Sequence, residues 1–200
     1  MKRKYELTDE TMELYGTTFR RIKALIDFSD VMAGDLGGWV ENEDNLSHDG
    51  NAWVYSGAWV YGNARVFGNA KVFDNARVYG NAQVNGYSEI YGDAQVFGNA
   101  RVYGNAEIYG DAWVYGNAEI YGNAGVYGNA QVYGDAQVYG NALVFDNARV
   151  YGDAQVYNDA RVYDNAQVYG DAQVFSKKTT QNVCSYKKCS YICNNNNNKK

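Results

Sequence analysis

Small and hydrophobic residues alternate with polar ones along most of the chain, and the pattern repeats every six residues. Between Ala52 and Val174 the repeated unit reads Ala-x-Val-Tyr-Gly-Asn, where x is polar in most units. The small residue, alanine or once serine, recurs at every sixth position through 21 units without insertion or deletion. Such a strict, short period indicates a solenoid, in which each unit packs on its neighbours.

The unit divides into a short strand and a corner. Side chains alternate in direction along a strand, so the alanine and the valine share one face, and x shares the other with the aromatic residue. The valine is predicted to point inward, because x is Arg, Lys, Glu or Gln in most units. Gly-Asn then forms the corner, since glycine accepts a positive φ and Asn or Asp tolerates it better than other residues. Corners without glycine support this interpretation, because they carry Asp74, Asp146, Asn158 and Asp164 instead.

Three such units close a triangular coil of about 18 residues. The 21 units therefore predict about seven regular coils and a prism on the order of 34 Å long. The fold class is all-β, a single-stranded parallel β-helix spanning residues 39–176. Its first coil is irregular, because Trp39 and Trp53 occupy the same position of the unit but are 14 residues apart rather than 12. We expect a two-residue bulge between residues 45 and 49.

The flanking segments lack the repeat. Residues 1–38 are expected to form a small N-terminal cap, with strands from Thr11 to Leu14 and from Thr17 to Leu25 forming a hairpin. A short helix is the alternative for residues 22–28. Residues 177–200 are rich in Lys and Asn and have too little apolar content to fold alone, so they are predicted to be a disordered tail.

Charge and hydropathy exclude two classes of partner. The formal net charge is −5 and the pI is about 4.9, which argues against a nucleic-acid-binding protein. No apolar run approaches the roughly 18 residues that a membrane-spanning helix needs. The basic start at Met1 is followed by polar residues rather than an apolar segment, which is not typical of a signal peptide. We therefore expect a cytoplasmic protein with no membrane partner.

The repeat resembles a known family. Val-Tyr-Gly-Asn-Ala-x is similar to the bacterial hexapeptide repeat, an aliphatic residue followed four residues later by a small one. The resemblance implies a left-handed parallel β-helix, whereas the general rule for parallel crossovers would favour the right-handed sense. Residues 31–41, followed by Asn45-Leu46-Ser47-His48, also resemble the opening of uncharacterised bacterial proteins described as hexapeptide-repeat acyltransferases.

The second resemblance implies a candidate catalytic residue. Acyltransferases of this family typically use a histidine as general base and hold acyl-CoA, such as acetyl-CoA, between the subunits of a trimer. The single histidine of this chain, His48, is the candidate. A base needs an orienting partner and a cleft, but the 21 regular units extrude no loop. We therefore favour a structural role for His48 in the first coil.

The outward aromatic residues predict three columns, one for each face of the prism. Stacked rings stabilise their neighbours, which is the structural explanation of the columns. The functional explanation is a binding surface for a protein or a carbohydrate, since Tyr and Trp combine apolar area with a polar tip. The preferred face carries two tryptophans, two arginines and no acidic residue at position x; its expected residues are Trp59, Trp113, Tyr61, Tyr79, Phe97, Tyr115, Tyr133, Arg77 and Arg149.

Corner carboxylates provide a candidate metal site. Asp135, Asp153 and Asp171 are spaced by 18 residues, so they are expected to align along one edge of the prism. A bound Ca²⁺ would relieve their repulsion, because this cation takes carboxylate and carbonyl oxygens. The favoured interpretation is that aspartate serves here as a turn residue facing solvent, without a metal.

The sequence favours one function and leaves two alternatives. An uninterrupted repeat with one histidine outside it predicts a non-catalytic scaffold or binding module without a cofactor. The first alternative is a trimeric acyltransferase that uses acetyl-CoA and His48. The second is a self-assembling protein, because the ends of a β-helix expose strand edges that can pair end to end.

Overall fold

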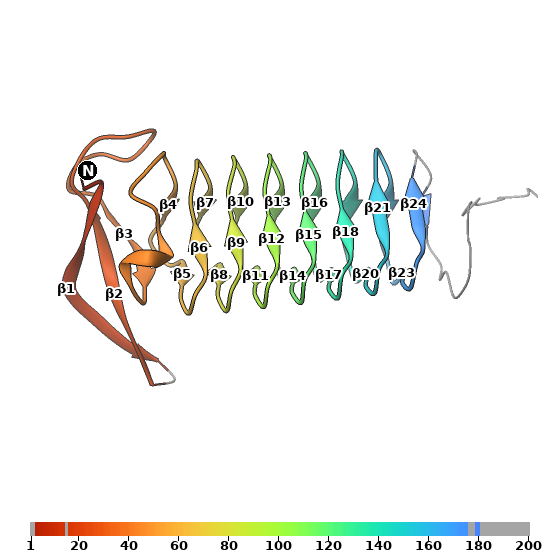
Figure 1. The fold of residues 1–200 in the computed structure, drawn as a ribbon, viewed down its shortest axis with the longest axis horizontal. Helices are drawn as coiled ribbons and strands as arrows, with labels where there is room; N and C mark the ends of the chain where they lie inside the picture. Colours follow the sequence, from red (N-terminus) through yellow and green to blue (C-terminus); the bar gives the residue numbers. More distant parts are fainter. Residues whose placement is uncertain (1–2, 15, 176–178, 181–200) are drawn as a thin grey trace, which may run out of the picture.

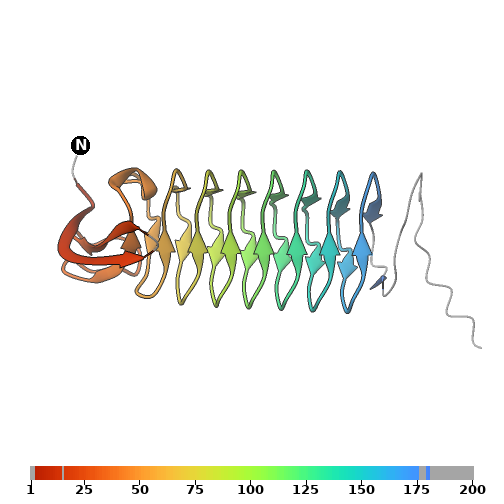
Figure 2. The same cartoon turned by 90° about the horizontal axis from the view of Figure 1, so that it is seen from below.

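The protein is an elongated triangular prism with a hairpin at its N-terminal end (Figures 1 and 2). A computed structural model describes residues 3–14, 16–175 and 179–180. Three sheets form the sides of the prism, and within the coils neighbouring strands of each sheet are parallel. The predicted all-β parallel β-helix is confirmed, and the left-handed triangular form that the resemblance implies is consistent with the three parallel sheets.

Each sheet collects every third strand of the helix. The first sheet contains β1 (Tyr5–Leu14), β2 (Thr17–Ala24), β3 (Leu36–Val40), β5 (Trp59–Val60), β8 (Arg77–Val78), β11 (Gln95–Val96), β14 (Trp113–Val114), β17 (Gln131–Val132), β20 (Arg149–Val150) and β23 (Gln167–Val168). The second contains β4 (Trp53–Val54), β7 (Lys71–Val72), β10 (Glu89–Ile90), β13 (Glu107–Ile108), β16 (Gly125–Val126), β19 (Leu143–Val144), β22 (Arg161–Val162) and β25 (Thr179–Thr180). The third contains β6 (Arg65–Val66), β9 (Gln83–Val84), β12 (Arg101–Val102), β15 (Glu119–Ile120), β18 (Gln137–Val138), β21 (Gln155–Tyr157) and β24 (Gln173–Phe175).

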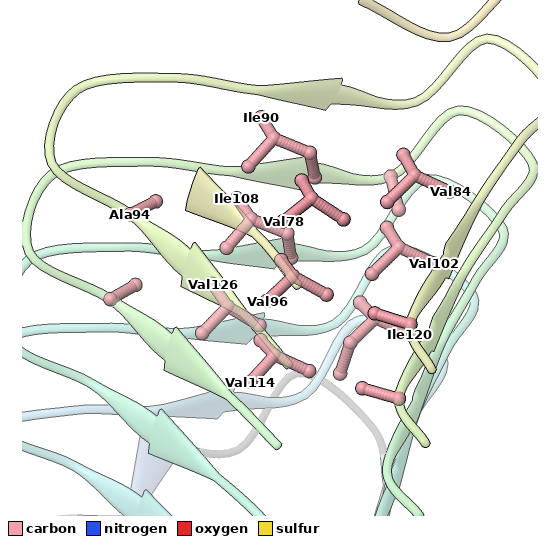
Figure 3. Close-up of a cluster of buried hydrophobic side chains, with 14 of the residues drawn as sticks. Val78, Val84, Ile90, Ala94, Val96, Val102, Ile108, Val114, Ile120 and Val126 are labelled. Carbon is pink, nitrogen blue, oxygen red and sulfur yellow. The ribbon is translucent and has the colours of Figure 1, made fainter. Parts of the chain in front are cut away.

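The core is a column of aliphatic side chains inside the prism. In the regular coils each residue pairs with the residue 18 positions later, so that Val78 lies beside Val96 and Val96 beside Val114. The valines and isoleucines of the three sides point toward one another (Figure 3), and they and the alanines are buried along the whole helix. Burying one valine contributes roughly 1.5 kcal/mol or more, so the repetition supplies the stability.

The corners have the predicted backbone conformation. Within the repeat, the glycines that precede Asn or Asp have φ between +64° and +79°. Asp74, Asp146, Asn158 and Asp164, which replace glycine, all have φ +58°. Asn and Asp adopt this left-handed conformation more readily than other non-glycine residues, which confirms the interpretation of these positions.

The first coil is irregular where the sequence predicts a bulge. Val40 pairs with Val60 and Leu46 with Val66, each 20 residues apart, whereas Val54 pairs with Val72, 18 apart. The two extra residues therefore lie between Leu46 and Val54, next to the 3-10 helix η1 (Glu43–Asn45).

The N-terminal segment contains an antiparallel hairpin of β1 and β2, and β2 also pairs antiparallel with β3. The alternative of a helix over residues 22–28 is wrong, because β2 continues to Ala24 with Ile22 and Ala24 buried against the first coil. β1 begins at Tyr5, six residues earlier than expected, because Tyr5 is itself part of the core.

One short strand lies beyond the range that the sequence assigned to the helix. β25, at residues 179–180, pairs parallel with β22. The rest of the predicted disordered tail, residues 181–200, lies outside the described residues. Within the described part of the chain, no helix is long and apolar enough to cross a membrane.

The corner geometry predicts a position-dependent cost of adding a methyl group. Gly116 has φ +73°, and a Cβ there would lie 2.9 Å from the backbone nitrogen of Gly134. We expect Gly116→Ala to lower the free energy of unfolding by about 1–2 kcal/mol or more, because a left-handed alanine is strained. Urea unfolding followed by circular dichroism measures this change.

Gly125→Ala is the matched control within the same helix. Gly125 does not have a positive φ, and its added Cβ would lie 3.0 Å from the flexible end of the Leu143 side chain. We expect a smaller loss of stability than for Gly116→Ala. Equal losses at the two positions would contradict the role assigned to the corner glycines.

Candidate binding surface

The tryptophans and arginines of the preferred face lie on one side of the prism. The name tryptophan face is used here for the outward side of the first sheet from β5 to β23. Its strands present Trp59, Arg77, Gln95, Trp113, Gln131, Arg149 and Gln167 in register. Arg77, Trp113 and Arg149 are exposed, and the indole of Trp113 has 40% of its surface in contact with solvent. The structure therefore brings the predicted residues together; their role in binding stays a prediction.

The aromatic residues beside these strands form continuous stacks. On the tryptophan face the stacked rings are Tyr61, Tyr79, Phe97, Tyr115, Tyr133, Tyr151 and Tyr169, with centroids 4.8–5.2 Å apart and planes within 9° of parallel. The second sheet has the same arrangement from Phe73 to Tyr163, and the third from Tyr103 to Phe175. Asn85 interrupts the third column.

Stacking limits which surfaces of the column rings are accessible to a ligand. Each inner ring is covered on both faces by its neighbours, and all the column rings are only half exposed. The rings therefore present mainly their edges and hydroxyl groups to solvent. Some hydroxyls are also engaged, because Tyr79 donates to Gln95 Oε1 at 3.1 Å and Tyr151 donates to Gln167 Oε1 at 3.3 Å.

Trp59 lies at the joint with the N-terminal hairpin rather than on the open face. Its indole stacks on Trp39 at 5.7 Å, and the ring of Phe19 meets it edge-on at 4.9 Å. Phe19 also contacts Tyr61 at 5.4 Å. A small cavity of about 40 Å³ remains between the hairpin and Arg77. Trp59 and Tyr61 thus hold the hairpin, and the accessible part of the face begins at Arg77.

Burial in the stacks raises the pKa of the tyrosines. Desolvation is the main cause, and nearby Glu107 adds to it at Tyr91 and Glu119 at Tyr103, so that each pKa rises to about 12. Tyr79, Tyr109 and Tyr121 shift in the same direction, again mainly through desolvation.

These shifts predict an alkaline limit to stability. The folded tyrosines hold their protons above the ordinary pKa of about 10, so between about pH 10 and pH 12 the folded state binds more protons than the unfolded state. Stability is therefore fully present below pH 10 and is lost as the pH rises through 12. Urea midpoints across this range, with the ultraviolet absorbance of tyrosinate, measure both effects. Ionisation of all tyrosines near pH 10 without loss of stability would contradict the prediction.

His48 lies in the seam between the N-terminal strand and the first coil. Its ring stacks on Tyr5 with the centroids 4.2 Å apart, and its Nδ1 accepts a hydrogen bond from the Lys4 backbone amide at 3.3 Å. Its Nε2 is buried and has no hydrogen-bond partner among the described residues. Desolvation lowers the pKa of the imidazole, with Glu43 opposing and Arg3 adding to the effect. The ring thus packs in the seam between the cap and the first coil, and its structural role stays a prediction.

The lowered His48 pKa predicts a loss of stability in mild acid. Between the folded pKa and the ordinary value of about 6.5, the unfolded state binds more protons than the folded state. Stability is thus present above pH 6.5 and falls as the pH drops through the folded pKa, because protonation removes the Nδ1 acceptor. Thermal unfolding between pH 8 and pH 5 should show this decline in the wild type and not in His48→Gln. The same decline in both proteins would exclude His48 as its source.

Two buried polar side chains, one in the cap and one in the first coil, could not be identified from the repeat. Lys4 Nζ donates to Ala52 O at 2.8 Å, and burial lowers its pKa to about 8, although Asp49 opposes the shift. Asn45 Nδ2 donates to Gly62 O at 3.0 Å and Ala64 O at 2.9 Å. Both side chains donate hydrogen bonds to backbone carbonyl oxygens near the N-terminal end of the helix. Neither residue has an equivalent in the repeat, so the periodic pattern gave no signal for it.

The asparagine side chains at the corners form hydrogen-bonded ladders along the prism. Asn63, Asn81, Asn99 and Asn117 each donate an amide hydrogen bond to the next coil, and the last donates to Asp135 Oδ1 at 2.8 Å. The ladder ends there because an ionised carboxylate has no donor. Within the described residues no group of three or more His, Cys, Asp or Glu side chains is placed to hold a metal ion, so Asp135, Asp153 and Asp171 are not brought together as one.

Comparisons with known proteins identify the repeat. Segments 70–86, 94–106, 136–152, 144–158 and 154–170 match a family model described as YdcK Beta solenoid repeat. The chain is also 41% identical over 61 residues to the protein named "Uncharacterized acetyltransferase YdcK" of Escherichia coli (strain K12). This alignment covers 26% of the chain and 19% of the relative, so the chain spans less than a fifth of that protein. The matched segments of this chain are thus similar to the β-solenoid repeats of YdcK.

Proposed function

We propose that the protein is a non-catalytic scaffold that binds a protein partner through the tryptophan face. The observation that carries this proposal is the composition of that face: exposed Trp113 between exposed Arg77 and Arg149, with no acidic side chain on its strands. Trp and Arg are the residues most enriched among binding hot spots. The long, regular coils hold these side chains at fixed spacing, which limits the entropy lost on binding.

The stacked columns support a protein partner rather than a carbohydrate. A sugar binds aromatic residues by lying on a free ring face, and in the columns the neighbouring rings cover these faces. Trp113 is the exception, because its indole meets Phe97 edge-on at 6.3 Å and 74°. One open indole among polar side chains suits a protein anchor, with Gln95 and Gln131 beside it to pair with polar groups of the partner.

The transferase alternative has less support in the geometry. His48 uses Nδ1 to accept from the backbone and stacks its ring on Tyr5, so a substrate would have to displace these contacts. The regular coils carry no extruded loop that would form a cleft. The alternative depends on the name of a relative, and the alignment covers only 19% of that relative.

Site-specific photo-crosslinking tests the proposed face. A benzophenone amino acid replaces Gln131 on the tryptophan face or, as a matched control, Gln137 on the third sheet. We expect position 131 to crosslink a discrete protein in a lysate of the source organism and position 137 to crosslink none. Adding Trp113→Ala should lower the yield at position 131 about tenfold or more, since it removes a hot-spot side chain.

Arg161→Ala on the second sheet should leave the yield at position 131 unchanged. Equal crosslinking from positions 131 and 137 would contradict a dedicated face. A glycan array that shows binding lost in Trp113→Ala would replace the protein partner by a carbohydrate. Calorimetry with acetyl-CoA addresses the enzyme: heat of binding in the wild type that disappears in His48→Ala would establish the transferase instead.

A further inference from the structure

A hollow of about 470 Å³ lies between the second sheet and the loop that joins β2 to β3. It is on a different side of the prism from the tryptophan face. It is open to solvent, and its lining combines two aromatic rings with four charged side chains; the lining residues are Asp30, Leu36, Tyr55, Ser56, Lys71, Phe73, Asp74 and Glu89. Three carboxylates face one ammonium group there, so the hollow carries an excess of negative charge.

Lys71 satisfies one of these carboxylates and leaves another without an ion pair. Its Nζ lies 3.0 Å from Asp30 Oδ1, and Tyr55 Oη donates to the same carboxylate at 2.8 Å. Burial opposes ionisation of Asp30, but these hydrogen bonds outweigh it and lower its pKa to about 2. Glu89 pairs in register with Lys71, yet it forms no ion pair within the described part of the chain.

The carboxylate of Glu89 also has a like-charged neighbour. Glu107 is its register partner on the next coil, and Glu107 is exposed. Desolvation raises the pKa of the neighbouring Tyr91, and Glu107, Tyr109, Glu89 and Asp74 add to this shift. A bound cation would relieve this repulsion.

The aromatic column is interrupted at the hollow. Tyr55 and Phe73 meet edge to face, with centroids 6.0 Å apart and planes at 79°, because Tyr55 is turned toward Asp30. On its other side Phe73 stacks on Tyr91 at 4.9 Å and 4°, as in the rest of the column. Tyr55 therefore contacts Phe73 on this side at a steep angle rather than in a parallel stack, and both rings line the hollow.

The chain itself shows which ligand chemistry fits. The ammonium of Lys71 lies 5.8 Å from the centre of the Tyr55 ring while it binds Asp30, a cation held by an aromatic ring and a carboxylate together. Phe73 and Glu89 line the same hollow, and among the described residues no ion pair involves Glu89 and no cation–ring contact involves Phe73. A guanidinium group is planar, stacks on aromatic rings and donates two parallel hydrogen bonds to one carboxylate.

We propose that this hollow binds the guanidinium group of an arginine side chain presented by a protein partner, with Glu89 as its carboxylate and Phe73 as its aromatic wall. Leu36 at the rim has 46% of its surface exposed and would pack against the peptide that carries the arginine. The site lies on the second sheet and does not depend on the tryptophan face.

Chemical-shift titration with short peptides tests the site on the whole protein. The probe is acetyl-Gly-Arg-Gly-amide, and the control peptide replaces arginine by citrulline, which has nearly the same shape without the charge. We expect the arginine peptide to shift the amide resonances of Phe73 and Glu89 in a saturable manner and the citrulline peptide to leave them unchanged. Glu89→Gln should weaken the arginine peptide about fivefold or more, since it removes a charge-assisted bidentate pair.

Two further variants give opposite expectations. Glu119→Gln, on the third sheet, removes the same charge outside the hollow and should leave the affinity within about twofold. Lys71→Met removes the competing ammonium and should tighten binding about twofold to fivefold, since it removes like-charge repulsion of the ligand.

Three results would overturn the proposal: equal shifts with the citrulline peptide, equal weakening by Glu119→Gln, or tighter binding of free agmatine than of the peptide. The last result would assign the hollow to a small diffusible amine instead of a protein side chain.

Discussion

The structure depends on one constraint, the register of 18 residues that places each residue of the regular coils beside its own equivalent on the next coil. Parallel strands about 4.8 Å apart leave no freedom in this arrangement, because a slip by one residue would turn the valines outward. Every position of the unit must therefore pack well against a copy of itself. Valine and alanine meet this requirement inside the prism, glycine at the corner and an aromatic ring outside.

The same constraint explains why the tyrosines are a structural feature first. A large aromatic residue on the outer face would be costly if it stood alone in water. In a column it is flanked by two parallel rings at about 4.9 Å, which bury most of its apolar surface. The outward aromatic residue thus extends the core onto the surface. It follows that the features specific to this protein lie where self-stacking stops: at Trp113, at the joint with the hairpin, and where Tyr55 turns away from Phe73.

The irregular end shows how a β-helix is closed. In the cap, Lys4 Nζ donates to Ala52 O and the hydroxyl of Tyr5 donates to Leu46 O at 2.8 Å, both in the first coil. Within the first coil, Asn45 Nδ2 donates to Ala64 O on the next coil. His48 completes this seam by accepting from the Lys4 amide. The candidate catalytic histidine of the sequence thus contacts the cap through its ring and its Nδ1 atom.

The sequence by itself determined the repeat, the inward and outward positions, the left-handed corners and the alignment of Trp113 with Arg77 and Arg149. These follow from a period of six residues, because translation along the chain becomes translation along the prism. Only the tertiary structure decided that neighbouring rings cover one another's faces and that the hairpin covers part of Trp59. It also decided that Lys71 forms its ion pair with Asp30 rather than with its register neighbour Glu89. The physical reason is that these outcomes depend on side-chain rotation and on contacts between the unique cap and the repeat. Such contacts join residues with no fixed spacing in the sequence, and periodicity carries no information about them.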